Sequence, residues 1–184
     1  YGGSCFPKDT MALVETARDV DAPVRIVETV IEINEMRKAG MAQKVMEACG
    51  GSVLGKLIAV LGLTFKPNTD DMRDSPSLAI ISDLQESGAS IRAYDPQGMD
   101  EAASLIEGVT FCEGTYEAME DADALVIVTE WNAFRALDLE RVKMLLKKPV
   151  MIDLRNIYSP REMEQAGFHY YSVGRVPVVQ EYES

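Results

Sequence analysis

The sequence predicts an α/β protein: a Rossmann-like, doubly wound, mostly parallel sheet preceded by a long central helix. Two observations predict it. From residue 53 onward, short apolar segments alternate with segments of helical pattern, and strands that alternate with helices form parallel sheets through right-handed crossovers. Before that point, residues 24–48 carry apolar side chains at helical spacing without a break. We therefore expect two parts, residues 1–50 and residues 51–184.

The first part is expected to contain two helices. Residues 9–19 have a helical pattern, and Pro23 then interrupts it. Proline is favoured in the first turn of a helix, so we expect a second helix over residues 24–48, which Gly50 and Gly51 end. A helix of this length is unusual in a globular protein. Little sequence precedes it, so we expect its apolar stripe to pack between subunits or between domains.

The second part is expected to be the sheet domain. Its expected strands are KLIAVLGLTF, ASIRAYDP, VTFC, DALVIVTEW and PVMIDLRN, and its expected helices are SPSLAIISDLQESG, MDEAASLIEG, TYEAMEDA, LDLERVKMLLKK and PREMEQAG. Ser75 is the expected N-cap of the first of these helices, with Pro76 in the first turn. A strand that binds a dinucleotide would lead into G-x-G-x-x-G, whereas the first strand leads into GLTFKP. The sequence therefore predicts a nucleotide-type fold without the dinucleotide fingerprint.

Composition narrows the classes of function. The net charge of -12 over 184 residues argues against nucleic acid as a partner, because phosphate backbones require a basic surface. The longest apolar runs are too short to span a bilayer. Three cysteines without C-x-x-C spacing and a single histidine make a metal site improbable, and they favour a reducing cytoplasm over a disulfide framework. Cys49 and Cys112 are interpreted as structural residues.

The stretch GGSCFPKD combines groups that suit covalent chemistry. Its glycines permit a close approach of the backbone to a ligand. Lys8 and the helix that begins after Asp9 would both favour the thiolate form of Cys5, which is the nucleophilic form. Asp9 could hold or activate a water molecule. From these residues alone, a catalytic cysteine and a purely structural loop are about equally supported.

Two further motifs follow expected strands, where open α/β sheets bind ligands. In GLTFKPNTDDMRDSPS, the cations Lys66 and Arg73 precede a helix whose N-terminus attracts anions. This pattern suits a diphosphate, although the aspartates of the segment oppose it and a solvated charged loop is the alternative. In DLRN, Arg155 could clamp a phosphate or a sugar, and a surface salt bridge is the alternative.

The three motifs in this order resemble the nucleotide-sugar 6-dehydrogenase family over essentially the whole chain. The phenylalanine in SCFPKD favours the UDP-glucose branch over the GDP-mannose branch, and a GDP-mannose or other nucleotide-sugar 6-dehydrogenase is the alternative. Family members have an NAD-binding Rossmann domain, then central helices, then a UDP-binding domain. The resemblance implies that residues 1–50 are the cysteine loop with part of the central dimerisation domain. Residues 51–184 would be the C-terminal UDP-sugar-binding domain.

The resemblance also implies a mechanism. In this family the C6 alcohol of the sugar is oxidised twice, two NAD molecules are consumed, and a uronic acid results. Cys5 would be the nucleophile that captures the aldehyde-level intermediate, and water would hydrolyse the thioester that follows. Asp9 would position or deprotonate that water. Lys8 and Arg73 would contact NAD at the cleft.

Substrate contacts are implied for a second set of residues. Lys66, with the backbone around Phe65, would hold the UDP-sugar, and Tyr1 and Gly2 would line the substrate side of the loop. Arg155 matches an arginine that reaches the substrate of a neighbouring subunit, so the resemblance implies a homodimer or a higher oligomer.

A non-catalytic UDP-sugar-binding and dimerisation module is the competing class of function. The family's other catalytic groups (a lysine, an asparagine, a glutamate and a threonine) lie upstream of the residues in this chain. We therefore expect an enzyme for the intact protein, and for these 184 residues alone we expect weak nucleotide binding without oxidation.

Overall fold

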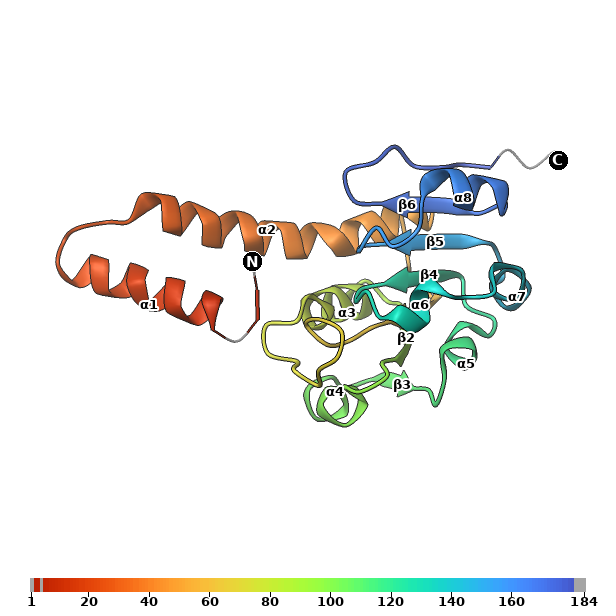
Figure 1. The fold of residues 1–184 in the computed structure, drawn as a ribbon, viewed down its shortest axis with the longest axis horizontal. Helices are drawn as coiled ribbons and strands as arrows, with labels where there is room; N and C mark the ends of the chain where they lie inside the picture. Colours follow the sequence, from red (N-terminus) through yellow and green to blue (C-terminus); the bar gives the residue numbers. More distant parts are fainter. Residues whose placement is uncertain (1, 4, 181–184) are drawn as a thin grey trace.

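The computed structural model describes residues 2–3 and 5–180 (Figure 1). Two helices come first, α1 (Phe6–Asp19) and α2 (Arg25–Ala48), and they pack side by side as a hairpin that projects from the sheet domain. α1 begins three residues earlier than expected, because Pro7 fits the first turn of a helix. α2 begins at Arg25, so Pro23 precedes the helix and does not lie in its first turn.

The sheet confirms the predicted fold class. Six parallel strands lie in the order β3-β2-β1-β4-β5-β6, which is the doubly wound order whose switch point lies between β1 and β4. The strands are β1 (Leu57–Leu61), β2 (Ser90–Tyr94), β3 (Val109–Phe111), β4 (Ala124–Ile127), β5 (Val150–Asp153) and β6 (His169–Ser172). The four-residue β6 was not predicted, since its alternating burial extends over too few residues to give a clear strand pattern.

Helices cover both faces of the sheet. They are α3 (Pro76–Glu86), α4 (Met99–Leu105), α5 (Thr115–Met119), α6 (Asn132–Arg135), α7 (Leu139–Leu145) and α8 (Pro160–Gln165). Ser75 caps α3 as predicted, and Pro76 is its first residue. The single-turn α6 was not predicted. Within the described residues, no helix is both long enough and apolar enough to cross a membrane.

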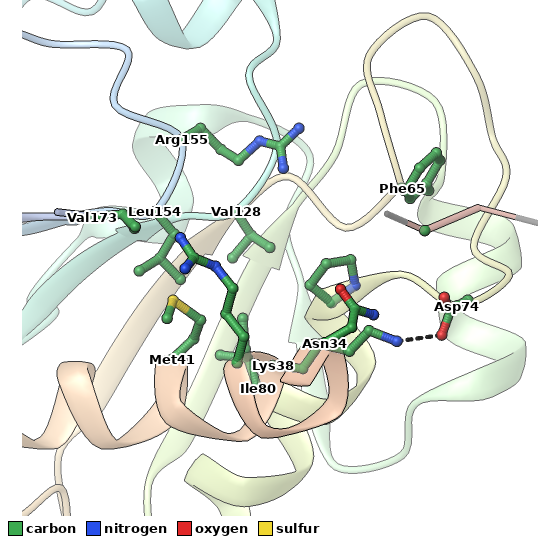
Figure 2. Close-up of a pocket in the computed structure, with 13 residues that line it drawn as sticks. Asn34, Lys38, Met41, Phe65, Asp74, Ile80, Val128, Leu154, Arg155 and Val173 are labelled. Atoms are coloured by element: carbon green, nitrogen blue, oxygen red, sulfur yellow. Dashed lines mark hydrogen bonds and ion pairs between the residues drawn. The ribbon is translucent and has the colours of Figure 1, made fainter. Parts of the chain in front are cut away.

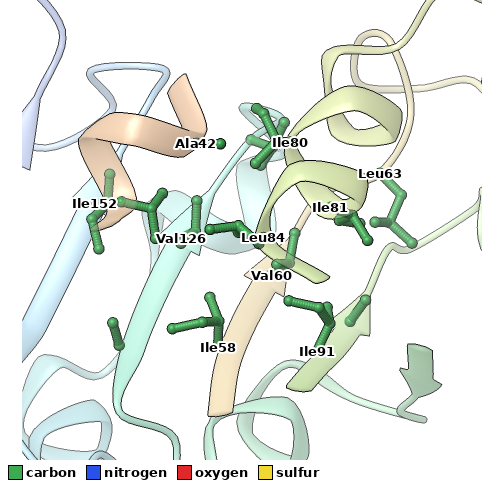
Figure 3. Close-up of a cluster of buried hydrophobic side chains, with 14 of the residues drawn as sticks. Ala42, Ile58, Val60, Leu63, Ile80, Ile81, Leu84, Ile91, Val126 and Ile152 are labelled. Carbon is green, nitrogen blue, oxygen red and sulfur yellow. The ribbon is translucent and has the colours of Figure 1, made fainter. Parts of the chain in front are cut away.

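The C-terminal half of α2 is part of the sheet domain's core. Ala42 and Val45 are buried with residues of α3 and of the central strands, including Ile80 and Ile152 (Figure 3). The first half of α2 instead leaves Ile26 82% exposed. One helix therefore runs from the projecting hairpin into the core, and its middle passes the carboxyl edge of the sheet.

Asp95, which follows β2, ties the loops of this edge together. It is 1% exposed. Its carboxylate accepts hydrogen bonds from the backbone N–H groups of Leu63, Thr64, Gln97 and Gly98, from the Thr64 hydroxyl, and from Trp131 Nε1. Burial alone would raise the pKa of Asp95, but the backbone donors outweigh it and hold this pKa below its ordinary value. The loops after β1, β2 and β4 are thus fixed by one buried anion.

We expect Asp95→Asn to lower the free energy of unfolding by about 3 kcal/mol, because the amide leaves at least two buried donors without an acceptor. The depressed pKa of the folded carboxyl contributes stability above the unfolded value of about 3.9, and this contribution is lost as the pH falls through the folded pKa. Chemical denaturation between pH 2 and 7 (roughly the range of carboxyl titration) measures both effects. Glu107→Gln, at an exposed position, is the control. An Asp95→Asn protein as stable as the parent would contradict the role assigned to this carboxylate.

Candidate functional site

A cavity of about 240 Å³ lies at the carboxyl edge of the sheet, beside the switch point. Its walls come from α2, from the loop between β1 and α3, and from the ends of the central strands. Figure 2 shows Asn34 and Met41 on α2, with Val128 and Leu154 across the cavity. Ligands of open α/β sheets bind at this place. The cavity is therefore the candidate site.

The turn at the end of β1 differs from a dinucleotide-binding turn. Gly62 has φ +88°, and a Cβ at this position would lie 2.6 Å from the backbone nitrogen of Thr129, so the ends of β1 and β4 touch. After this glycine the chain turns inward, where the N–H groups of Leu63 and Thr64 donate to Asp95. These N–H groups are engaged inside the protein and form no cradle for a diphosphate.

The cysteine motif packs against the loop that follows β1. A Cβ at Gly2 would lie 2.6 Å from Cε2 of Phe65, and a Cβ at Gly3 (φ +82°) would lie 2.8 Å from Cε1 of the same ring. Only glycines let the ring approach this closely. Gly2 and Phe65 both line the cavity. The structure thus brings two of the predicted motifs together, while Tyr1, also predicted at this place, lies outside the described residues.

Cys5 is exposed and occupies the N-cap position of α1. Its carbonyl accepts a hydrogen bond of 2.9 Å from the N–H of Asp9 in the first turn. The Asp9 carboxylate pairs with Lys8 at 3.6 Å, and both side chains are exposed. The three predicted residues are therefore grouped at one helix end, which faces solvent in these 184 residues.

Arg73 lies near this helix end. Its guanidinium pairs with Asp71 at 2.9 Å. The hydrogen bond to Asp71 raises the pKa of Arg73 and lowers the pKa of Asp71, and a thiolate at Cys5 would add a smaller increase to the pKa of Arg73. Arg73 and Cys5 therefore lie within electrostatic range of each other, although one belongs to the sheet domain and the other precedes α1.

The structure separates Lys66 from Arg155. Lys66 is exposed and, within the described chain, does not line the cavity. Arg155 lines it and forms an ion pair with Glu130. Burial alone would raise the pKa of Glu130, but the Arg155 guanidinium outweighs this effect and lowers it. The N–H of Arg155 donates to Asp153, which fixes the backbone at the end of β5.

The sequence analysis missed the contribution of α2. Asn34, Arg37 and Lys38 line the cavity, and Lys38 pairs with Asp74 just before α3 and with Glu35 at 3.0 Å. Burial alone would lower the pKa of Lys38, but the two carboxylates outweigh it and raise this pKa. The spacing 34, 37, 38, 41 places these side chains on one helix face. That spacing was available in the sequence as a signal.

Among the described residues, no group of three histidine, cysteine or acidic side chains is placed to hold a metal ion. The cavity combines three cations, the amide of Asn34, the carboxylate of Asp74 and apolar surface. Together with the strand order, it defines a nucleotide-type α/β domain whose site is shared between a sheet and a long helix.

Comparison with known families identifies this class more closely. Residues 59–160 match the UDP binding domain of the UDP-glucose/GDP-mannose dehydrogenase family, and residues 1–36 match the central domain of the same family. The chain belongs to this family. The first match covers β1 to the start of α8, and the second covers the cysteine loop, α1 and the first half of α2.

Similar proteins agree with this assignment. The chain is 58% identical over 175 residues to a UDP-glucose 6-dehydrogenase of Rhizobium meliloti (strain 1021), a match that covers 95% of this chain and 40% of that protein. It is 47% identical over 179 residues to UDP-glucose 6-dehydrogenase TuaD of Bacillus subtilis (strain 168), covering 97% and 39% of the two chains. The chain thus spans about 40% of the length of the curated relatives it matches.

Solved structures show the same fold. A UDP-glucose dehydrogenase from Pyrobaculum islandicum superimposes with a TM-score of 0.75 at 32% identity, covering 88% of this chain and 36% of that chain. An NDP-N-acetyl-D-galactosaminuronic acid dehydrogenase from Methanosarcina mazei Go1 superimposes with a TM-score of 0.83 at 27% identity, covering 95% of this chain and 38% of that chain.

The contact between the cysteine motif and Phe65 can be tested through its glycine. Gly3→Ala places a methyl group in strained backbone and against the Phe65 ring, so we expect a loss of about 1 kcal/mol in stability and displacement of the ring. Thermal unfolding and the aromatic NMR signals of Phe65 measure these effects. Gly40→Ala, in open helical space, should leave the ring signals unchanged. Unchanged Phe65 signals in Gly3→Ala would show that the two loops do not touch.

Proposed function

We propose that this chain is the nucleotide-sugar-binding part, with the cysteine loop, of an NAD-dependent UDP-glucose 6-dehydrogenase that oxidises UDP-glucose to UDP-glucuronate. One observation carries the proposal: the contact of Gly2 and Gly3 with Phe65, which holds the Cys5 loop beside the cavity at the switch point. The names of the relatives with 58% and 47% identity support UDP-glucose over GDP-mannose as the substrate.

The residues of the loop suit a two-step oxidation. NAD, when bound, accepts the hydrides removed from C6 of the sugar. Cys5 Sγ would add to the carbon of the C6 aldehyde, forming a C–S bond, and the aldehyde oxygen would take up a proton. After the second oxidation the carbon is held as a thioester. Water then attacks it, the C–S bond breaks, and the carboxylate leaves while the thiol is restored. Asp9, in the first turn of α1, would position or deprotonate this water.

The sheet domain itself does not fit NAD. The turn after β1 is GLTFKP, and the carboxylate after β2, where a dinucleotide domain holds a ribose hydroxyl, is enclosed among protein donors. Contact with the cofactor from this chain is therefore assigned to Lys8 and Arg73, which are exposed cations near Cys5. The remainder of the cofactor site belongs to parts of the enzyme beyond these residues.

Substrate contacts are assigned to Gly2, Phe65, Lys66 and Arg155, together with Tyr1. Arg155 lines the same cavity as Gly2 and Phe65, which supports a contact with the substrate of its own chain. A contact with the substrate of a neighbouring subunit stays a prediction. A cavity of about 240 Å³ lies below the roughly 300–1,000 Å³ of small-molecule sites, so part of the substrate would be covered by the rest of the enzyme.

Taken alone, the chain supports the binding function better than the catalytic one. Its sequence contains no G-x-G-x-x-G, and it spans about 40% of the matched relatives. The cavity and its cations belong to the described residues and do not depend on an NAD-binding domain. We therefore propose nucleotide-sugar binding for the chain and oxidation for the intact enzyme.

In the full-length enzyme, we expect Cys5→Ala to abolish formation of the acid while UDP-glucose affinity stays within about twofold. The thiol makes the covalent bond, whereas other residues hold the nucleotide. NADH production and calorimetric titration of UDP-glucose measure the two properties. Cys49→Ala removes a half-buried thiol away from the cavity and should retain turnover. Near-normal NADH production by Cys5→Ala would remove Cys5 from the mechanism.

The exposed apolar side chains of the hairpin predict self-association. They include Met11, Leu13, Val20, Ile26, Val30, Ile33 and Met36, and apolar patches of this kind mark interfaces. We expect the parent chain to be dimeric at about 10 μM, the range in which such interfaces persist, and Val30→Glu to shift it toward monomer in light scattering. Met144→Glu adds the same charge to an exposed methionine of α7 and should leave the dimer intact. A monomeric parent would contradict the prediction.

A further inference from the structure

The cavity contains a buried donor and a buried acceptor that the protein does not satisfy. Within the described residues, the amide nitrogen of Asn34 and the Oδ2 atom of Asp74 have no hydrogen-bond partner. Both residues line the cavity (Figure 2). Buried polar groups are nearly always paired in folded proteins, and an unpaired one costs stability. Two such atoms of opposite type at one cavity indicate a ligand that offers both acceptors and donors.

Arg37 is the cation of the cavity whose charge the protein leaves uncompensated. Three cations line the cavity: Arg37, Lys38 and Arg155. Lys38 pairs with Asp74 and Glu35, and Arg155 pairs with Glu130. Among the residues that the structure describes, Arg37 forms neither an ion pair nor a side-chain hydrogen bond. Its guanidinium donors are therefore available, and a guanidinium binds phosphate through two parallel hydrogen bonds.

The apolar part of the lining limits the ligand further. Met41, Ile80, Val128 and Leu154 line the same cavity as the polar groups. An inorganic anion would leave this surface without a partner, and an apolar ligand would leave Arg37 unpaired. A nucleoside diphosphate offers phosphate oxygens as acceptors, ribose hydroxyls as donors, and the faces of a base and a sugar for apolar contact.

We propose that Arg37 binds the diphosphate of the nucleotide and that α2 is therefore part of the nucleotide site; this inference rests on the proposed function. The amide of Asn34, one turn before Arg37, supplies a further donor, and Asp74 accepts a hydrogen bond from a ribose hydroxyl. The two unpaired atoms are shielded from solvent, so they reach the ligand when the side chains turn about their terminal torsions, which are broad for asparagine and aspartate.

Lys38 acts as a positioning residue in this arrangement. Its ion pair with Asp74 joins the middle of α2 to the segment before α3. Both of its carboxylate partners belong to the protein, so little of its charge is left for a ligand. Lys38 instead fixes the distance between Arg37 on α2 and the loop that carries Lys66 and Arg73.

Calorimetric titration of UDP and of uridine into the 184-residue chain tests the proposal. We expect Arg37→Gln to weaken UDP binding about tenfold or more, the effect of one charge-assisted hydrogen bond, and to change uridine binding less than about twofold. The salt dependence of UDP binding should also decrease in this variant. Arg25→Gln removes the same charge from an exposed position of α2 and should bind UDP like the parent. Thermal unfolding confirms that each variant is folded.

The outcomes separate this inference from the proposed function. If the parent binds UDP and Arg37→Gln binds it equally well, the assignment of Arg37 is wrong and the proposed function stands. If Arg37→Gln lost equal affinity for UDP and for uridine, the assignment of Arg37 would also be wrong, because Arg37 would then not contact the phosphates. A parent that does not bind UDP at millimolar concentration (roughly the weakest specific binding) would overturn the inference and the binding function together. Asn34→Leu, which keeps helical propensity and removes the amide, should weaken UDP binding without altering its salt dependence.

Discussion

The buried carboxylate of Asp95 is the interaction on which the carboxyl edge of the sheet depends. It holds the loop after β1 through Leu63, the loop after β2 through Gly98, and the segment after β4 through Trp131. Each of these donors would need another partner if the carboxylate faced solvent. A dinucleotide domain uses an acid at this position for a ribose hydroxyl. Here the same position stabilises the protein, and the candidate ligand cavity lies one strand away, between β1, β4 and α2.

α2 joins three regions of the structure in one helix. Its first turns expose Ile26 and Val30, its middle lines the cavity with Asn34 and Arg37, and its last turns are buried at Val45. A helix rises 1.5 Å per residue and does not flex between these segments unless a kink interrupts it. A change in packing at the exposed end would therefore move the cavity wall as well. The proposed oligomeric contacts and the proposed nucleotide binding would therefore be mechanically linked through α2.

Much of the fold could be predicted from the sequence, because alternating strands and helices leave few topologies. The cap at Ser75 was also predictable, since Ser-Pro is a strong helix start. The sequence could not predict that Asp95 turns inward, because a carboxylate after β2 could equally bind a ligand. The pairing of Lys38 with Asp74 depends on the crossing of α2 and α3, which lie far apart in sequence. The polar side chains of α2 share one helix face, but such a face is usually solvated, so their spacing alone did not distinguish a site from an ordinary surface.

The charges around the cavity decide how an acidic chain could bind the proposed anion. Lys8, Lys38, Arg73 and Arg155 each pair with a carboxylate of the chain. Such pairs hold the cations in place, and they also reduce the local charge available to a phosphate. A diphosphate arriving at this edge therefore gains most from a cation without such a partner and from neutral donors that are already buried. Affinity for the proposed ligand would therefore depend on directed hydrogen bonds at Arg37 and its neighbours on α2, because the net charge of -12 opposes the approach of an anion.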